Sequence, residues 1–202
     1  MSVRQFSHTI EAGMLLLKPG TTMKFPLTVK MDALKQNKAE VSVDAGELGL
    51  TLVNGKQTIA IAIQHVPYAP GGINYVETNS DVISGIFSGC VMSIYLAGGK
   101  RRVAHVHTGD DAGTGLDCKS TFKALLNSPG YAEQFSFKPF RRSDDMVAAA
   151  IAMKTQFGAE GCATFGYVTK GNICYSLFTR KVSTHEYVIE NVEQRTDGFV
   201  FG

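Results

Sequence analysis

The sequence predicts an α+β protein with two packed, mostly antiparallel β-sheets, a sandwich-like arrangement flanked by two or three helices. Eight or more short runs favour strands, and the few runs that favour helices do not alternate regularly with them. The chain has 202 residues, of which 44% are hydrophobic, so it can bury one good-sized core. No repeat or linker divides it, and we expect a single domain over residues 1–202.

The N-terminal part of the chain supplies the first strand signals. After a short strand or helix within residues 1–24, three runs rich in strand-forming residues follow: 40–44, 48–53 and 58–63. Asn54-Gly55, between the last two, is a strong signal for a hairpin turn. Residues 67–80 carry prolines, glycines and asparagines and predict a loop, which either forms one wall of a cleft or simply connects its neighbours.

The C-terminal half adds the helices. Residues 118–126 predict a short helix that is capped at Asp117 or Ser120. Residues 146–157 are Ala-rich and predict the clearest helix in the chain. The proline-interrupted segment 135–140 fits an edge strand or a bridging loop. Three further runs favour strands: 162–169, 173–180 and 186–192.

Charge and cysteine content exclude several classes of protein. The formal net charge is only +2, so no basic field attracts nucleic acid or an anionic membrane. No apolar run is long enough for a membrane span or a cleavable signal peptide, and we expect a soluble monomer. The four cysteines form no C-x-x-C pair, which favours reduced thiols over a zinc ribbon or a disulfide scaffold.

The segment around Cys90 predicts a β-hairpin whose register brings a thiol and an imidazole together. Residues 84–109 hold two β-rich runs that flank Gly98-Gly99, and glycine tolerates the positive φ angles of a two-residue turn. With those glycines as the turn, Cys90 lies directly opposite His107. Facing residues have Cβ atoms roughly 4.5–5.5 Å apart, which is close enough for a thiol to pass its proton to an imidazole.

The neighbours of Cys90 suit a nucleophile. The thiolate is the reactive form of cysteine, and an adjacent imidazolium favours it. Ser88 and Gly89 precede the cysteine, and a glycine there lets backbone N–H groups approach an attacked carbonyl, as in an oxyanion site. A third polar group usually orients the histidine. The candidates are Ser84, Thr108 or a backbone carbonyl of the preceding loop.

Two other uses of these residues stay open. His105 shares the face of Cys90 but lies opposite Met92, so it is the alternative base. Histidines two positions apart on a strand can also share a metal ion with a cysteine, but no carboxylate lies close in the sequence, and we expect no metal. Buried strand cysteines are usually inert. That is the expectation for the other three cysteines: Cys118, Cys162 and Cys174.

The hairpin resembles the active-site segment of the cysteine-dependent protein glutamine deamidases. Phe-Ser-Gly-Cys90 is similar to the Leu-Ser-Gly-Cys signature of the toxin group, which includes the cytotoxic necrotizing factors and the Burkholderia lethal factor. The related chemoreceptor glutamine deamidases use a Gly-Ser-Cys signature and place a histidine on the returning strand, as His107 is here. Both branches carry a functional Thr six positions before the cysteine, where this chain has Ser84.

The resemblance implies a single catalytic domain that deamidates a glutamine of a target protein. Thr108-Gly109 stands where the chemoreceptor branch has Leu-Pro, which favours the toxin branch. A bacterial toxin or effector is then implied, present in the bacterial cytoplasm and secreted or injected into a host cytosol without a cleavable signal peptide. The resemblance implies Cys90, His107 and Ser84 as catalytic residues and no cofactor.

In the implied reaction, Cys90 attacks the carboxamide of a glutamine side chain, and His107 protonates the departing ammonia and then activates water. An amine in place of water gives a transglutaminase side activity. Two alternatives stay open. One is a Cys-His peptidase, and the other is a non-enzymatic β-sandwich binding domain in which Cys90 only packs in the core.

Overall fold

The computed structural model describes residues 22–24, 41–42, 47–54, 57–108, 117–140, 161–183 and 186–201. These residues form twelve strands and one helix. In chain order they are β1 (Thr22–Lys24), β2 (Val41–Ser42), β3 (Glu47–Asn54), β4 (Gln57–Pro67), β5 (Ile73–Glu77), β6 (Val82–Gly85), β7 (Val91–Ala97), β8 (Lys100–Val106), α2 (Cys118–Leu126), β9 (Tyr131–Phe137), β10 (Cys162–Val168), β11 (Cys174–Ser183) and β12 (Glu186–Arg195).

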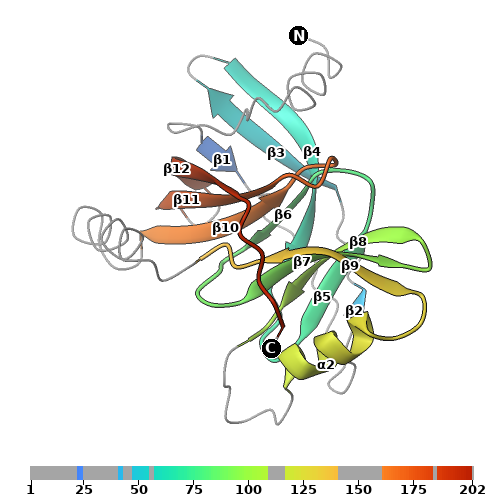
Figure 1. Ribbon diagram of the computed structural model, residues 1–202. Helices are drawn as coiled ribbons and strands as arrows, with labels where there is room; N and C mark the ends of the chain where they lie inside the picture. The colour runs from blue at the N-terminus through green and yellow to red at the C-terminus, as the bar shows by residue number, and fades with distance from the viewer. Residues whose placement is uncertain are drawn as a thin grey trace.

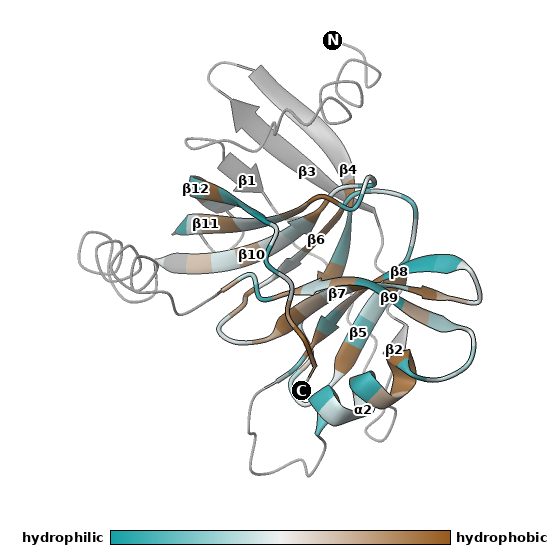
Figure 2. Ribbon diagram, in the orientation of Figure 1, coloured by the Kyte–Doolittle hydropathy of each residue, from teal (hydrophilic) through white to brown (hydrophobic). Residues whose placement is uncertain are grey.

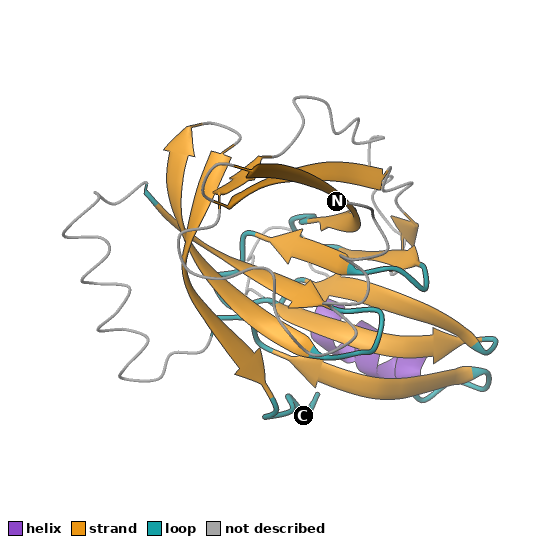
Figure 3. Cartoon of the chain, turned by 90° about the horizontal axis from the view of Figure 1, so that it is seen from above, coloured by secondary structure: helices purple, strands orange, loops and turns teal. Residues whose placement is uncertain are grey.

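The strands make two sheets (Figures 1 and 3). Seven of them close into a barrel in the order β1-β12-β11-β10-β6-β4-β3, and five form a second sheet in the order β2-β5-β8-β7-β9. Most pairs are antiparallel, with β4–β6 and β2–β5 as parallel exceptions. The predicted α+β class with two mostly antiparallel sheets is confirmed. Closure of the first sheet was not predicted, because it depends on β1 pairing with both β3 and β12, which lie far apart in the chain.

The predicted helix 118–126 is confirmed as α2. Asp117 caps it, because its Oδ1 accepts a hydrogen bond from the backbone N–H of Ser120 at 3.0 Å. The apolar side of the helix, including Phe122, packs against the five-stranded sheet. Figure 1 shows α2 below the strands of this sheet. The predicted helix 146–157 lies outside the described residues. No helix in the described ranges has the length and apolar character needed to cross a membrane.

One strand prediction needs correction. Residues 67–80 were expected to be a loop, but Ile73–Glu77 form β5, which pairs with β8. The prolines and glycines on either side favoured a loop prediction, although strand-forming residues stand between them. The hairpin predicted around Asn54-Gly55 is present as β3–β4, in which Asn54 is the last residue of β3 and pairs with Gln57. The segment 135–140 falls partly in β9, an edge strand as expected.

The described hydrophobic core lies in three layers. One fills the closed sheet around Ile63 and Leu177, and a second joins the two sheets through Met92 and Val168. The third lies between the five-stranded sheet and α2. Side chains alternate along β7 and β8, so each of these strands contributes to both the second and the third layer. Figure 2 shows the hydrophilic start of β8, which projects beyond the core.

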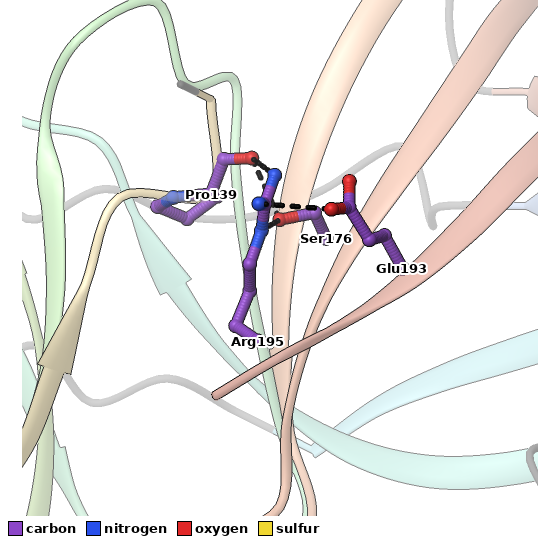
Figure 4. A network of polar contacts seen from close by, with 4 residues as sticks. All are labelled: Pro139, Ser176, Glu193 and Arg195. Atoms are coloured by element: carbon purple, nitrogen blue, oxygen red, sulfur yellow. Dashed lines mark hydrogen bonds and ion pairs between the residues drawn. The ribbon is translucent and has the colours of Figure 1, made fainter. Parts of the chain in front are cut away.

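Two arginines also link the two sheets, Arg195, which is buried, and Arg101, which is half-buried. Arg195 at the end of β12 donates from Nε to Ser176 Oγ at 2.7 Å and from a terminal nitrogen to the carbonyl of Pro139, which follows β9 (Figure 4). It also pairs with Glu193 at 3.2 Å. Arg101 of β8 donates to the carbonyl of Thr169 beyond β10 at 3.0 Å. These contacts fix how the closed sheet and the five-stranded sheet meet, which is where the candidate site lies.

Candidate active site

The hairpin of β7 and β8 has the register that the sequence predicts. Ala97 pairs with Lys100, and Gly98 and Gly99 have φ angles of 57° and 79°, which only glycine adopts readily. His105 lies opposite Met92, as expected. Cys90 precedes β7 and His107 follows β8, and the Cys90 sulfur lies 3.9 Å from Nδ1 of His107. The predicted juxtaposition of thiol and imidazole is therefore present.

The thiol of Cys90 is buried, with 6% of the residue exposed. Cys118 is buried to the same extent, but its sulfur lies in the layer beside α2, and burial raises the pKa of its thiol. Burial likewise raises the pKa of Cys174 to about 12. Among the three cysteines whose side chains are described, Cys90 is the one whose sulfur contacts an imidazole. Burial alone therefore does not distinguish it, but its partner does.

The loop between β4 and β5 holds His107 at two points. The phenolic oxygen of Tyr68 lies 3.0 Å from Nδ1 of His107, and the Tyr68 ring lies 5.7 Å from the imidazole ring. The backbone N–H of His107 donates to the carbonyl of Gly72 at 3.2 Å. Sequence reasoning missed Tyr68. The suggestion that this loop forms a wall of a cleft was the nearest signal, but nothing in the sequence singled out one of its side chains.

Thr108 supports the backbone that leads into Cys90. Its hydroxyl donates to the carbonyl of Gly89 at 2.8 Å, which fixes the plane of the Gly89–Cys90 peptide. Ser88 is exposed and Gly89 is half-buried, so this peptide borders the surface. A Cβ atom built on Gly89 would meet nothing within 4 Å. Crowding within the protein therefore does not require a glycine at this position.

Ser84 is placed against His105 and does not hydrogen-bond to His107. Its Oγ donates to the carbonyl of Val66 at 2.5 Å and lies 2.8 Å from Nδ1 of His105. Both residues are almost fully buried, and the His105 ring stacks on Phe87 with centroids 4.1 Å apart. Burial, together with the nearby rings of His107 and His65, lowers the pKa of His105 to about 3. An imidazole this weakly basic and this enclosed is a structural group and a poor alternative base.

The third described histidine completes this buried cluster. His65 is partly buried on β4, and burial lowers its pKa to about 4. In the described part of the chain, no three His, Cys, Asp or Glu side chains are arranged to hold a metal ion. Nδ1 of His105 lies 2.8 Å from Ser84 Oγ and is therefore already engaged.

The site thus consists of a buried thiol, an imidazole at the predicted register position and a tyrosine that the prediction lacked. Such a set can carry nucleophilic attack by sulfur with proton transfer to and from nitrogen. The chain matches no protein-family model, no curated protein and no solved structure.

Proposed function

We propose that the chain is a cysteine-dependent protein glutamine deamidase in which Cys90 is the nucleophile and His107 its base. The observation that supports the proposal is the 3.9 Å separation of the Cys90 sulfur and Nδ1 of His107 across the β7–β8 hairpin. The Phe-Ser-Gly-Cys90 segment, which resembles the deamidase signature, supplies the reaction class. Neither is sufficient alone, because Cys-His pairs also serve peptidases.

The proposed reaction proceeds through a thioester. His107 accepts the Cys90 proton, and the thiolate attacks the carboxamide carbon of a substrate glutamine. The tetrahedral oxyanion is held by N–H groups near the Gly89–Cys90 peptide, which Thr108 keeps in place. The imidazolium then protonates the amide nitrogen as the C–N bond breaks, and ammonia leaves. Water, deprotonated by His107, cleaves the thioester to give glutamate and to restore the thiol.

The partner in this proposal is a protein that presents a glutamine side chain, and no metal or organic cofactor takes part. The resemblance to the toxin branch extends the proposal to an effector that acts on a host protein and works as a monomer. Ser84 has no direct role in the proposal, because its hydroxyl is committed to Val66 and His105. Ile86 and Ser88, which are exposed and precede Cys90 closely in the chain, form the surface where the substrate glutamine approaches.

The test is mass spectrometry of proteins incubated with the purified chain. Deamidation adds about one mass unit at a glutamine, and the thioester route predicts that Cys90→Ser abolishes it. His107→Ala should lower the rate by roughly 10²–10⁴-fold, the usual contribution of a general acid–base. Cys118→Ser is the matched control, because Cys118 is equally buried but belongs to α2 and packs in the layer between that helix and the five-stranded sheet.

Two results would contradict the proposal. Cleaved peptides in place of deamidated ones would identify a peptidase. Deamidation by Cys90→Ser at the rate of the native protein would show that the thiol takes no part in the reaction. Circular dichroism first confirms that Cys90→Ser is folded. This control is needed because the substitution changes one buried atom in the core layer that joins the two sheets.

A further inference from the structure

Two groups in the site approach the same atom of His107. The Tyr68 hydroxyl lies 3.0 Å from Nδ1, and the Cys90 sulfur lies 3.9 Å from that same nitrogen. An imidazole nitrogen has one position in the plane of the ring, which holds either a lone pair or a proton. It therefore makes one strong hydrogen bond at a time, and the two groups cannot both be its main partner.

The distances decide which partner prevails in this structure. An O–H···N contact at 3.0 Å is a normal hydrogen bond, whereas a sulfur–nitrogen separation of 3.9 Å lies at the long end of sulfur contacts. When Nδ1 carries its lone pair, the Tyr68 hydroxyl donates to it. The nitrogen is then less available to accept the proton of the Cys90 thiol.

Tyr68 belongs to a segment that can hold this position firmly. The residue is half-buried, and its ring also lies 5.3 Å from the ring of His105. Gly72, four residues further on, accepts the backbone N–H of His107. Gly71 between them has a φ of 62°, which lets the chain turn back toward the histidine. The tyrosine is thus fixed relative to His107 by packing as well as by its own hydrogen bond.

We propose that Tyr68 is a positioning residue that restrains the site, because its hydroxyl competes with the Cys90 thiol for Nδ1 of His107. In the resting protein this competition lowers the fraction of Cys90 present as thiolate without abolishing it. When the Tyr68 hydroxyl leaves Nδ1, the thiol proton moves to the histidine and the thiolate forms. The inference rests on the proposed roles of Cys90 and His107.

The test measures alkylation of Cys90 by iodoacetamide, in which a sulfur–carbon bond forms and iodide leaves. Tyr68→Phe removes the hydroxyl and keeps the ring. Loss of one competing hydrogen bond should raise the rate at neutral pH on the order of fivefold and move the midpoint of the pH–rate curve to lower pH. Mass spectrometry of the peptide that contains Cys90 separates this thiol from the other cysteines.

Two control comparisons make the result specific. Tyr75→Phe removes a hydroxyl from β5, where the ring packs against Tyr95 and Arg102, and should leave the alkylation of Cys90 unchanged. In a His107→Ala background, Tyr68→Phe should have no effect, because the atom for which the two groups compete is gone. A purely structural role of the hydroxyl would act equally in both backgrounds.

The inference is overturned if Tyr68→Phe leaves the rate unchanged or lowers it, or if the effect persists without His107. A lower rate would mean that the hydroxyl assists the thiolate. The proposed function fails separately. Suppose that Tyr68→Phe accelerates alkylation as expected, but neither the native protein nor Tyr68→Phe deamidates a glutamine. The competition at His107 is then supported and the deamidase assignment is wrong.

Discussion

The protonation of His105 follows from its hydrogen bonds at the scale of single atoms. Ser84 has one hydroxyl proton, and the carbonyl of Val66 can only accept, so that proton points to Val66. Ser84 Oγ must then accept from His105, which places the imidazole proton on Nδ1. Among the described residues, Nε2 of His105 has no hydrogen-bond partner. His105 is therefore a neutral group, held in one tautomer by its surroundings.

This predicts a loss of stability in acid. The pKa of His105 is about 3 in the folded protein against 6.5 for an unperturbed histidine, so the unfolded chain binds the proton more readily. Its contribution to stability is full above pH 6.5 and falls as the pH drops below that value. Between pH 7.5 and pH 5 the free energy of unfolding should decrease by roughly 2 kcal/mol because of His105 alone.

Urea unfolding at the two pH values measures this decrease, with His105→Gln as the comparison. The variant should be less stable at pH 7.5, but its decrease on acidification should be smaller by about the same 2 kcal/mol. His65 lies nearby with a pKa also lowered by burial, so some acid sensitivity remains in the variant. An identical decrease in both proteins would show that His105 is not a buried neutral group.

The closed sheet and the five-stranded sheet approach each other closely where β10 crosses β7. A Cβ atom on Gly166 of β10 would lie 2.5 Å from Met92 Sδ and 2.8 Å from Pro139 Cγ. Neither distance is possible without movement, so the closed sheet approaches β7 this closely only because residue 166 has no side chain. Met92 is the residue opposite His105, and the crossing therefore lies directly beside the buried histidine cluster.

Gly166→Ala should accordingly destabilise the protein by about 1–3 kcal/mol, the usual cost of an overpacked core. Gly171→Ala is the matched control, because its Cβ would meet only the Thr169 hydroxyl at 3.8 Å and its residue is exposed. Thermal or urea unfolding of both variants measures the difference. Equal stability of the two would mean that β10 and β7 are not packed as closely as described.

The elements that could be predicted from the sequence are those fixed by local signals. Gly98-Gly99 sets both the turn and the register of β7 and β8, and Asp117 marks the start of α2, so both were predictable. β5 was not, because its five residues stand between turn-forming neighbours. Ser84 was placed by resemblance near the catalytic histidine, but the pairing of β6 with β4 and β10 directs it to His105.

At the scale of the whole molecule, the candidate site is assembled where the two sheets meet. Cys90 and His107 come from the hairpin of the five-stranded sheet, whereas Tyr68 follows β4 of the closed sheet. The hairpin half of the site was predictable because one turn determines it. The Tyr68 half was not, because it depends on contacts between segments 39 residues apart in the chain. Arg101 and Arg195 tie the same two sheets together.

The central claim is that the imidazole of His107 makes Cys90 a reactive thiol. The most direct measurement compares the iodoacetamide alkylation rates of Cys90 and Cys118 at pH 7 in the native protein and in His107→Ala. We predict that Cys90 reacts faster than the equally buried Cys118, and that His107→Ala removes the difference. Equal rates in the native protein, or a fast Cys90 that does not depend on His107, would contradict the account.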